Sequence, residues 1–418
     1  MIDINNKLYT IAEALEEKLF KTFRGFEKTS EENTKRILSA FQQHRVSDSM
    51  FAGTSGYGYD DKGREALELI YADVFGTQSA LVRIGFVNGT HAISTALFSA
   101  LSPGDTMLSV TGTPYDTLRE TIGIGSCGHG SLKFYGVGYD EISLLTDGTP
   151  DYEGIRTRLL SGGISCVFIQ RSRGYSTRRA LSVSEIGRII ETVKSVHSEI
   201  TVIVDNCYGE FTETREPSHM GADIIAGSLI KNPGGGLAPT GGYVAGNTDL
   251  IERAAARMTT PGIGGECGPT LGTGRMLFQG FFMSPHTVCQ ALKTAAFAAG
   301  MLEELGYESS PGAYDRRSDI IQMISLKTGD NLERFCRGIQ HGSPVDSFLT
   351  PEPWQMPGYD CPVIMAAGAF VQGASIELSA DGPMREPFPA FLQGGISYES
   401  GKLGILIALS EMINNNNN

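Results

Sequence analysis

A lysine and an aspartate follow two consecutive apolar runs of the sequence. Asp205 ends the run TVIVD, and Lys231 comes shortly after the run DIIAGS. A carboxylate among buried residues is costly unless it is paired, and lysine is rarely buried alone. Taken singly, Asp205 is more typical of a cap on the following turn, and Lys231 of a solvated loop. Taken together, they indicate an amine and a carboxylate that meet one ligand.

The surroundings of Lys231 favour a bulky ligand on its amine. Residues 232–236 are small and glycine-rich, which leaves room for the backbone to approach a ligand. A lysine amine forms a Schiff base with the aldehyde of pyridoxal 5′-phosphate, and an aspartate keeps the pyridinium nitrogen of that cofactor protonated. The amine pKa must fall for this reaction, so we expect burial beside cationic groups to lower it. Lys231 and Asp205 are therefore the predicted catalytic pair.

A cofactor phosphate needs a cradle of hydrogen-bond donors. The turn Asn88-Gly89-Thr90-His91 follows the run ALVRIGF and precedes a helical pattern. Free N–H groups and the helix dipole meet at such a turn and favour an anion. Ser228 is expected to add a hydroxyl to the same phosphate, although a turn-forming serine is an equal alternative.

The sequence also offers a candidate for stacking on the cofactor ring, and it lacks the residue spacing of a metal site. Tyr115 follows the run TMLSV, where an aromatic ring could lie flat on the pyridine ring or be a core tyrosine. The histidines and cysteines are dispersed, with no CxxC or HxxxH spacing, so we expect no metal. A GxxxxGK[ST] motif for nucleoside phosphates is also missing.

The pattern of elements predicts an α/β protein with two domains. Short continuous apolar runs alternate with helical stretches from about 79 to 246, which favours a mostly parallel sheet flanked by helices. We expect an N-terminal helical segment and an inter-subunit loop over 1–60, a large cofactor-binding α/β domain over 61–305, a smaller α+β domain over 306–413, and a disordered tail over 414–418. Two helices are expected over 8–45, and strands at DIIQMISLK, CPVIMAAGAF and GASIELS.

Composition limits the class of protein. The 418 residues are 41% hydrophobic and 19% charged, with a net charge of −13. This acidic balance argues against nucleic acid as the partner, and no apolar run reaches the roughly 20 residues of a membrane span. The 7 cysteines are scattered, and the N-terminus lacks a signal-peptide core, so we expect a cytoplasmic protein with reduced thiols.

Several motifs carry a resemblance to a known family. The Ser-x-x-Lys at 228–231, the strand-end V-D-N at 204–206 and the spacing from Gly89 to Tyr115 resemble the cystathionine and methionine lyase group of fold-type I pyridoxal-phosphate enzymes. GYGYDDKGRE, IQRSRGYSTR, GSLIKNPGGGLAPTGGY and DGPMREPFPAFLQGG resemble the methionine gamma-lyase-like proteins often called aluminium-resistance proteins. These motifs cover most of the chain, from about 50 to 400.

The resemblance implies roles for the predicted residues. Lys231 would hold the cofactor and move the α-proton, and Tyr115 would stack and help to expel the leaving group. Tyr57 or Tyr59 would reach the phosphate of a neighbouring subunit, which implies a homodimer or homotetramer with shared active sites. Arg385 or Arg173 would bind the substrate carboxylate, because a guanidinium fork matches it. The segment 170–175 departs from the Glu-Thr-Pro-x-Asn-Pro of better-known lyases, so the substrate stays open.

Three functions remain in view at this point. The resemblance favours a carbon–sulfur lyase that eliminates a thiol from a sulfur amino acid such as cystathionine, cysteine or methionine. An aminotransferase or another amino-acid lyase would use the same cofactor and the same pair, Lys231 and Asp205. A catalytically idle binding protein on the same fold is the third alternative; such a protein would be expected to lack Lys231 or Asp205, and both are present.

Overall fold

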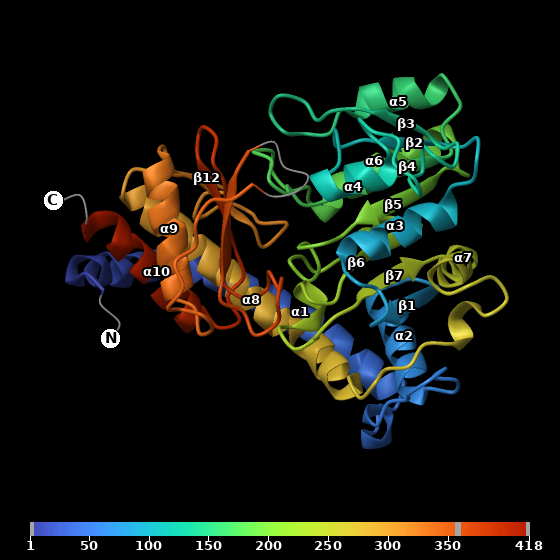
Figure 1. Cartoon of the computed structure of the whole chain (residues 1–418), viewed down its shortest axis with the longest axis horizontal. Helices are drawn as coiled ribbons and strands as arrows, with labels where there is room; N and C mark the ends of the chain where they lie inside the picture. The colour runs from blue at the N-terminus through green and yellow to red at the C-terminus, as the bar shows by residue number, and fades with distance from the viewer. Residues whose placement is uncertain (1–3, 356–360, 415–418) are drawn as a thin grey trace.

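The computed structural model describes residues 4–355 and 361–414. These residues form two β-sheets with helices packed against them, and two long helices run along both parts (Figure 1). The sequence predicts a disordered tail over 414–418; residue 414 is the last of a helix, and 415–418 lie outside the described residues. No described helix is long and apolar enough to cross a bilayer.

The larger sheet has seven strands in the order β1-β7-β6-β5-β4-β2-β3. Strand β7 is antiparallel to both β1 and β6, and the other neighbouring strands are parallel. The expected mostly parallel sheet is therefore confirmed, and five of the apolar runs form strands in it. The bounds are β1 (Ser79–Arg83), β2 (Thr106–Ser109), β3 (Gly138–Glu141), β4 (Cys166–Gln170), β5 (Thr201–Asp205), β6 (Ile224–Ser228) and β7 (Gly242–Gly246).

The central strands are continuous apolar runs because both of their faces are buried. In β4, Val167 and Ile169 pack into the core on one side, and Cys166 and Phe168 pack into the core on the other. Helices α3, α4 and α7 cover the second side, and α2, α5, α6 and part of α8 cover the first. The bounds are α2 (Lys62–Phe75), α3 (Gly89–Ala100), α4 (Asp116–Ile122), α5 (Tyr152–Leu160), α6 (Val183–Val196), α7 (Thr248–Met258) and α8 (Gly274–Glu304), with 3-10 turns η1 (Asp48–Phe51), η2 (Pro217–Met220), η3 (Asn232–Gly234) and η4 (Gly264–Glu266).

The smaller sheet is antiparallel, in the order β10-β11-β12-β9-β8. The prediction that GASIELS forms a strand is wrong for its first six residues, which are turns, because the strand begins only at Ser379. The first three residues of the motif DGPMREPFPAFLQGG are then strand, and Arg385 lies in the tight turn that follows. The bounds are β8 (Glu308–Ser310), β9 (Gln322–Ser325), β10 (Val363–Ala367), β11 (Ser379–Pro383), β12 (Pro389–Gln393), α9 (Gly329–His341) and α10 (Tyr398–Asn414).

Two helices join the parts. Helix α1 (Asn6–Gln43) is continuous, so the expectation of two helices over 8–45 is wrong. Gly25 lies inside this helix, at a position where a side chain would meet no other atom within 4 Å of its Cβ. The first half of α1 packs in the core of the smaller sheet and its second half in the core of the larger one, while α8 lies beside it in the reverse sense (Figure 1). The domain boundaries expected from the sequence stay a prediction.

Candidate active site

A cavity of about 1340 Å³ opens where the parallel strands of the larger sheet end. Gln170, Asp205 and Ser228 are the last residues of β4, β5 and β6, and all three line the cavity together with Lys231. The register places Asp205 between Gln170 and Ala226 on the neighbouring strands. Open α/β sheets bind ligands at this edge. Because an ordinary ligand pocket has roughly 300–1,000 Å³, the cavity can hold a cofactor and a substrate together.

The carboxylate of Asp205 is buried at the floor of this cavity. The residue is 4% exposed, and its Oδ1 accepts a hydrogen bond of 3.1 Å from the backbone N–H of Cys207. Burial raises the pKa of Asp205 above its usual value, and the nearby charge of Lys231 opposes that rise. A cationic atom of a ligand would be a better partner for this carboxylate than the groups that now surround it.

The amine of Lys231 lies over an aromatic ring. Its Nζ is 3.7 Å from the centroid of the Tyr208 ring, and the backbone of Tyr208 has a left-handed φ of 68°. Burial works to lower the pKa of Lys231, but the acidic groups of Cys207, Tyr208 and Asp205 outweigh it and raise the pKa. The prediction of a lowered pKa is therefore wrong for the protein itself, because acidic rather than cationic side chains surround the amine.

The start of α3 and the end of β6 approach each other closely. A Cβ on Gly89 would stand 3.2 Å from the Cβ of Ser228 and 3.4 Å from the Sγ of Cys207, so a side chain there would crowd both. Within the described structure the Oγ of Ser228 is buried and has no hydrogen-bond partner. Asn88 caps the helix by accepting a hydrogen bond of 2.8 Å from the N–H of His91. A buried hydroxyl without a partner, beside a helix N-terminus, is suited to an anion.

Most of the predicted phosphate-binding residues line the cavity, but one of them does not. Asn88, Gly89, Thr90 and Ser228 line it, whereas His91 does not. The N–H of His91 is used by the cap, and its Nδ1 accepts a hydrogen bond of 3.2 Å from the N–H of Val87. His91 is thus a residue of the helix start, and its predicted part in phosphate binding stays a prediction without a contact behind it.

Tyr115 stands between the helix start and the end of β4. Its hydroxyl is 3.0 Å from the Oγ1 of Thr90, and its backbone N–H donates a hydrogen bond of 3.0 Å to the Oε1 of Gln170. Burial raises the pKa of Tyr115, and the charge of Asp205 adds to the rise, so the phenol stays protonated. Tyr115 is thus held in the cavity wall at its backbone and at its hydroxyl, where its ring could stack on a cofactor.

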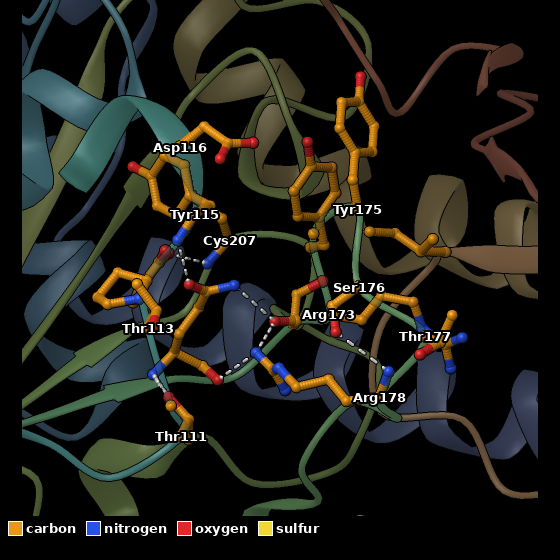
Figure 2. A pocket seen from close by; sticks show the side chains of 18 of the residues that line it. Thr111, Thr113, Tyr115, Asp116, Arg173, Tyr175, Ser176, Thr177, Arg178 and Cys207 are labelled. Carbon is orange, nitrogen blue, oxygen red and sulfur yellow. Dashed lines mark hydrogen bonds between the residues drawn. The ribbon is translucent and has the colours of Figure 1, made fainter. Parts of the chain in front are cut away.

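The segment after β4 supplies buried arginines to the same cavity (Figure 2). Arg173 is 1% exposed, and each of its terminal nitrogens donates a hydrogen bond of 3.4 Å to the Oγ of Ser310. Arg178 donates hydrogen bonds to the carbonyl oxygens of Gln170, Ser172 and Arg179. Burial lowers the pKa of Arg178 to about 10, and it lowers that of Arg173 as well.

Arg385, the other predicted carboxylate ligand, lies on the smaller sheet. It is exposed, it follows β11, and it lines the cavity. Among the described residues its guanidinium has no hydrogen bond or ion pair to a side chain. The structure thus brings both predicted arginines to one cavity.

Tyr57 and Tyr59 are not at this cavity. They are 71% and 53% exposed, and their rings stack on each other with centroids 5.6 Å apart. The buried guanidinium of Arg64 holds their loop, because it donates hydrogen bonds to the carbonyl oxygens of Gly58 and Gly268 at 2.5 and 2.8 Å. The pair is presented outward on a fixed loop, and its predicted reach into a neighbouring subunit stays a prediction.

A second buried polar network surrounds Arg171, the residue that follows Gln170. The guanidinium of Arg171 contacts Glu216 at 3.2 Å and Asn206 at 2.8 Å. Glu210 is 0% exposed, accepts a hydrogen bond of 2.9 Å from the hydroxyl of Tyr243, and has a second oxygen without a partner. Burial raises the pKa of Glu210 to about 8.

Sequence patterns did not show two residues of the cavity wall. Tyr208 is placed beside Lys231 by a backbone with left-handed φ. The residue types around Tyr208 do not predict that conformation. Arg178 lies in an Arg-rich stretch in which no spacing marks one arginine as buried. In the part of the chain that the structure describes, no cluster of three His, Cys, Asp or Glu side chains could hold a metal ion.

Comparisons with known proteins agree with this geometry. Residues 8–413 match the family model named methionine gamma-lyase. A crystal structure of a carbon-sulfur lyase involved in aluminum resistance from Clostridium novyi NT is 50% identical, with a TM-score of 0.95 over 98% of this chain and 97% of that one. The uncharacterized protein YnbB of Bacillus subtilis (strain 168) is 49% identical over 388 residues, which cover 93% of this chain and 92% of YnbB.

A more distant structure shows the fold. The pyridoxal-5′-phosphate dependent protein YhfS from Escherichia coli is 16% identical, with a TM-score of 0.62 over 91% of this chain and 95% of that one. The predicted fold-type I architecture, with a large sheet and a smaller α+β part, is therefore confirmed. From the match over nearly its whole length, the chain belongs to the methionine gamma-lyase family.

Proposed function

We propose that this protein is a pyridoxal-5′-phosphate enzyme that cleaves a carbon–sulfur bond of a sulfur-containing amino acid. The observation that carries the proposal is the wall of one cavity, where Asp205, Lys231 and the partnerless hydroxyl of Ser228 lie together. The solved relative from Clostridium novyi, named a carbon-sulfur lyase, supports the reaction class.

The residues present suit this cofactor at each of its polar ends. The hydroxyl of Ser228 and the first-turn amides of Gly89 and Thr90 offer donors to a phosphate. The buried carboxylate of Asp205 suits a protonated ring nitrogen, and Lys231 supplies the amine for the aldehyde. A Cβ on Gly89 would crowd the space between α3 and β6, so the glycine keeps the phosphate side open.

The bound cofactor supplies an electron sink for the pair left on the substrate Cα when its proton is removed. Lys231 Nζ would take that proton once the substrate amine has replaced it at the cofactor and left it neutral, and Arg173 or Arg385 would fix the substrate carboxylate. The Cα–Cβ double bond forms as the carbon–sulfur bond breaks in a β-elimination, and sulfur leaves with the bonding pair. The phenol of Tyr115, protonated at neutral pH, can give the departing thiolate its proton.

A second subunit completes the proposed site. Tyr57 and Tyr59 are exposed, stacked and held on a fixed loop, as expected of residues lent to a neighbour's phosphate. We therefore propose a homodimer or homotetramer with shared active sites, in the cytoplasm, where the free cysteines stay reduced.

Spectroscopy and thiol release test the proposal. Protein mixed with the cofactor should gain a near-visible absorbance that Lys231→Ala removes and that the exposed control Lys133→Ala retains. The wild type should then release a thiol from cystathionine or sulfide from cysteine by β-elimination, or methanethiol from methionine by γ-elimination. Absorbance that survives Lys231→Ala would contradict the cofactor assignment, and amino-group transfer without thiol release would contradict the lyase.

A further inference from the structure

A buried acid that the proposed reaction does not use lies behind the segment that carries Lys231. Glu210 is 0% exposed and is not among the residues that line the cavity. Its carboxyl packs against the backbone of β6, because a Cβ built on Gly227 would stand 2.5 Å from the Glu210 Oε1. Its backbone carbonyl accepts a hydrogen bond of 2.9 Å from the Nδ2 of Asn232. Glu210 thus contacts the chain on both sides of the stretch from Ser228 to Lys231.

The carboxyl of Glu210 has no cation paired with it. Its Oε1 accepts a hydrogen bond of 2.9 Å from the hydroxyl of Tyr243, and its Oε2 is buried without a hydrogen-bond partner among the described residues. No ion pair of the described residues includes Glu210, whereas Glu216 is paired with Arg171 at 3.2 Å. An ionised carboxylate is costly in such a place, and a bound proton removes the charge. Burial accordingly raises the pKa of Glu210 to about 8, and the charge of Glu216 adds to the rise.

The titratable groups that face Glu210 come from several elements of the larger sheet and its helices. They are Tyr71 on α2, Cys207 after β5, Glu216 before η2, Lys231 before η3 and Tyr243 on β7. Burial raises the pKa values of the two phenols and the thiol, so these groups are neutral. Lys231 is therefore the one cation in this set. Because an interaction between two charges acts on both partners, a charge on Glu210 favours the ammonium form of Lys231.

We propose that Glu210 is a positioning residue that controls the charge on the amine of Lys231. Acidic groups around Lys231 already favour its ammonium form, and the buried proton of Glu210 spares the amine a further negative charge. When Glu210 ionises in alkaline solution, the amine becomes harder to deprotonate. The neutral amine is the form that reacts with an aldehyde, so the proton on Glu210 keeps Lys231 reactive. The inference rests on the proposed function only for the task of Lys231, because the charge of the amine is measurable without the cofactor.

Acetylation of the protein without cofactor tests this control. The wild type and Glu210→Gln are treated with limiting acetic anhydride over a series of pH values, and the yield on Lys231 is divided by the yield on exposed Lys133 in the same sample. At about pH 6 the two proteins should give equal ratios, because residue 210 is neutral in both. Well above about pH 8 the ratio in Glu210→Gln should exceed that in the wild type by at least about threefold. The exposed control Glu252→Gln should follow the wild type at every pH.

Tyr243→Phe is a second variant that keeps the acid. It removes a hydrogen bond that favours the ionised carboxylate, so the pH above which acetylation of Lys231 falls behind that in Glu210→Gln should be higher than in the wild type. A merely structural role of Glu210 would change the yield on Lys231 by the same factor at every pH. That result, or equal ratios in the wild type and Glu210→Gln up to about pH 10, would overturn the inference.

Cofactor uptake separates this inference from the proposed function. With pyridoxal 5′-phosphate added, the rate at which the near-visible absorbance develops should show the same pH-dependent difference between the wild type and Glu210→Gln. If no absorbance develops but the difference in acetylation is seen, the proposed function fails and the control by Glu210 stands. If the absorbance develops but the acetylation ratios agree at every pH, the proposed function stands and the control by Glu210 fails.

Discussion

Two arginines of the segment that follows β4 lie only two residues apart and have opposite surroundings. Arg171 is 0% exposed and contacts the carboxylates of Glu216 and Glu213, each at 3.2 Å. Arg173 is 1% exposed, and its guanidinium donates to the hydroxyl of Ser310. Arg171 belongs to a network that is rich in acids, and Arg173 to a group that is rich in cations.

The difference shows two ways in which an excess of buried charge of one sign can be neutralised. On the acid-rich side, Glu210 has a pKa raised to about 8 by burial, so a bound proton neutralises the surplus carboxylate at neutral pH. On the cation-rich side an arginine keeps its proton near neutral pH, so we expect a ligand to add negative charge to that of Asp319, which already acts on Arg173. The first side stabilises the fold, and the second is available for binding.

The largest effect should follow from removing the paired arginine. Arg171→Ala leaves the buried carboxylate of Glu216 without its partner, so the free energy of unfolding should fall by about 3–5 kcal/mol. Chemical denaturation measures this loss. A change below about 1 kcal/mol would mean that the network does not support the fold.

The next effect concerns the acid-rich side and pH. Because the folded pKa of Glu210 is raised from 4.5 to about 8, the folded state holds a proton that the unfolded state releases above pH 4.5. Stability should therefore fall as pH rises through that window, with this group contributing up to about 1.4 kcal/mol per pH unit. Glu210→Gln should flatten the slope between pH 5 and 8, whereas exposed Glu252→Gln should leave it as in the wild type. An unchanged slope in Glu210→Gln would show that Glu210 is ionised in the fold.

A smaller effect on stability is expected on the cation-rich side. Arg173→Gln removes a buried charge that forms no ion pair among the described residues, so the free energy of unfolding should stay within about 1 kcal/mol of the wild type, or rise. Comparison with Arg171→Ala under the same denaturant sharpens the contrast. If Arg173→Gln and Arg171→Ala lowered the free energy of unfolding by similar amounts, the two arginines would not differ in their contribution to stability.

The smallest effect should come from Arg385. Its side chain is exposed and has no acid partner among the described residues, so Arg385→Gln should change the melting temperature of the ligand-free protein by less than about 1 °C. A clear drop would indicate a structural role in the turn between β11 and β12.

Sequence reasoning reached the cofactor side of the cavity more fully than the substrate side. Asp205, Ser228 and Lys231 follow apolar runs, and the edge of a parallel sheet gathers whatever follows such runs. Tyr115 and the turn at Gly89 were found by the same rule. Every one of these residues lines the cavity.

What the sequence could not show depends on neighbours brought in by the tertiary fold. The pKa of Lys231 moves upward because Cys207, Tyr208 and Asp205 surround it, and no local pattern reveals that set. The burial of Arg178 depends on carbonyl oxygens of its own loop. The strand at Ser379 was placed too early because Gly373–Leu378 has the composition of a strand but forms turns.

The central claim is that the amine of Lys231 holds the cofactor, and reductive trapping tests it most directly. The protein is incubated with pyridoxal 5′-phosphate, reduced with borohydride and digested, and the modified peptide is identified by mass spectrometry. We predict that the added mass of the pyridoxyl phosphate is found on Lys231 in the wild type. In Lys231→Ala, we expect no other lysine to be modified at the yield that Lys231 has in the wild type. Modification of surface lysines alone, with Lys231 unmodified, would contradict the account.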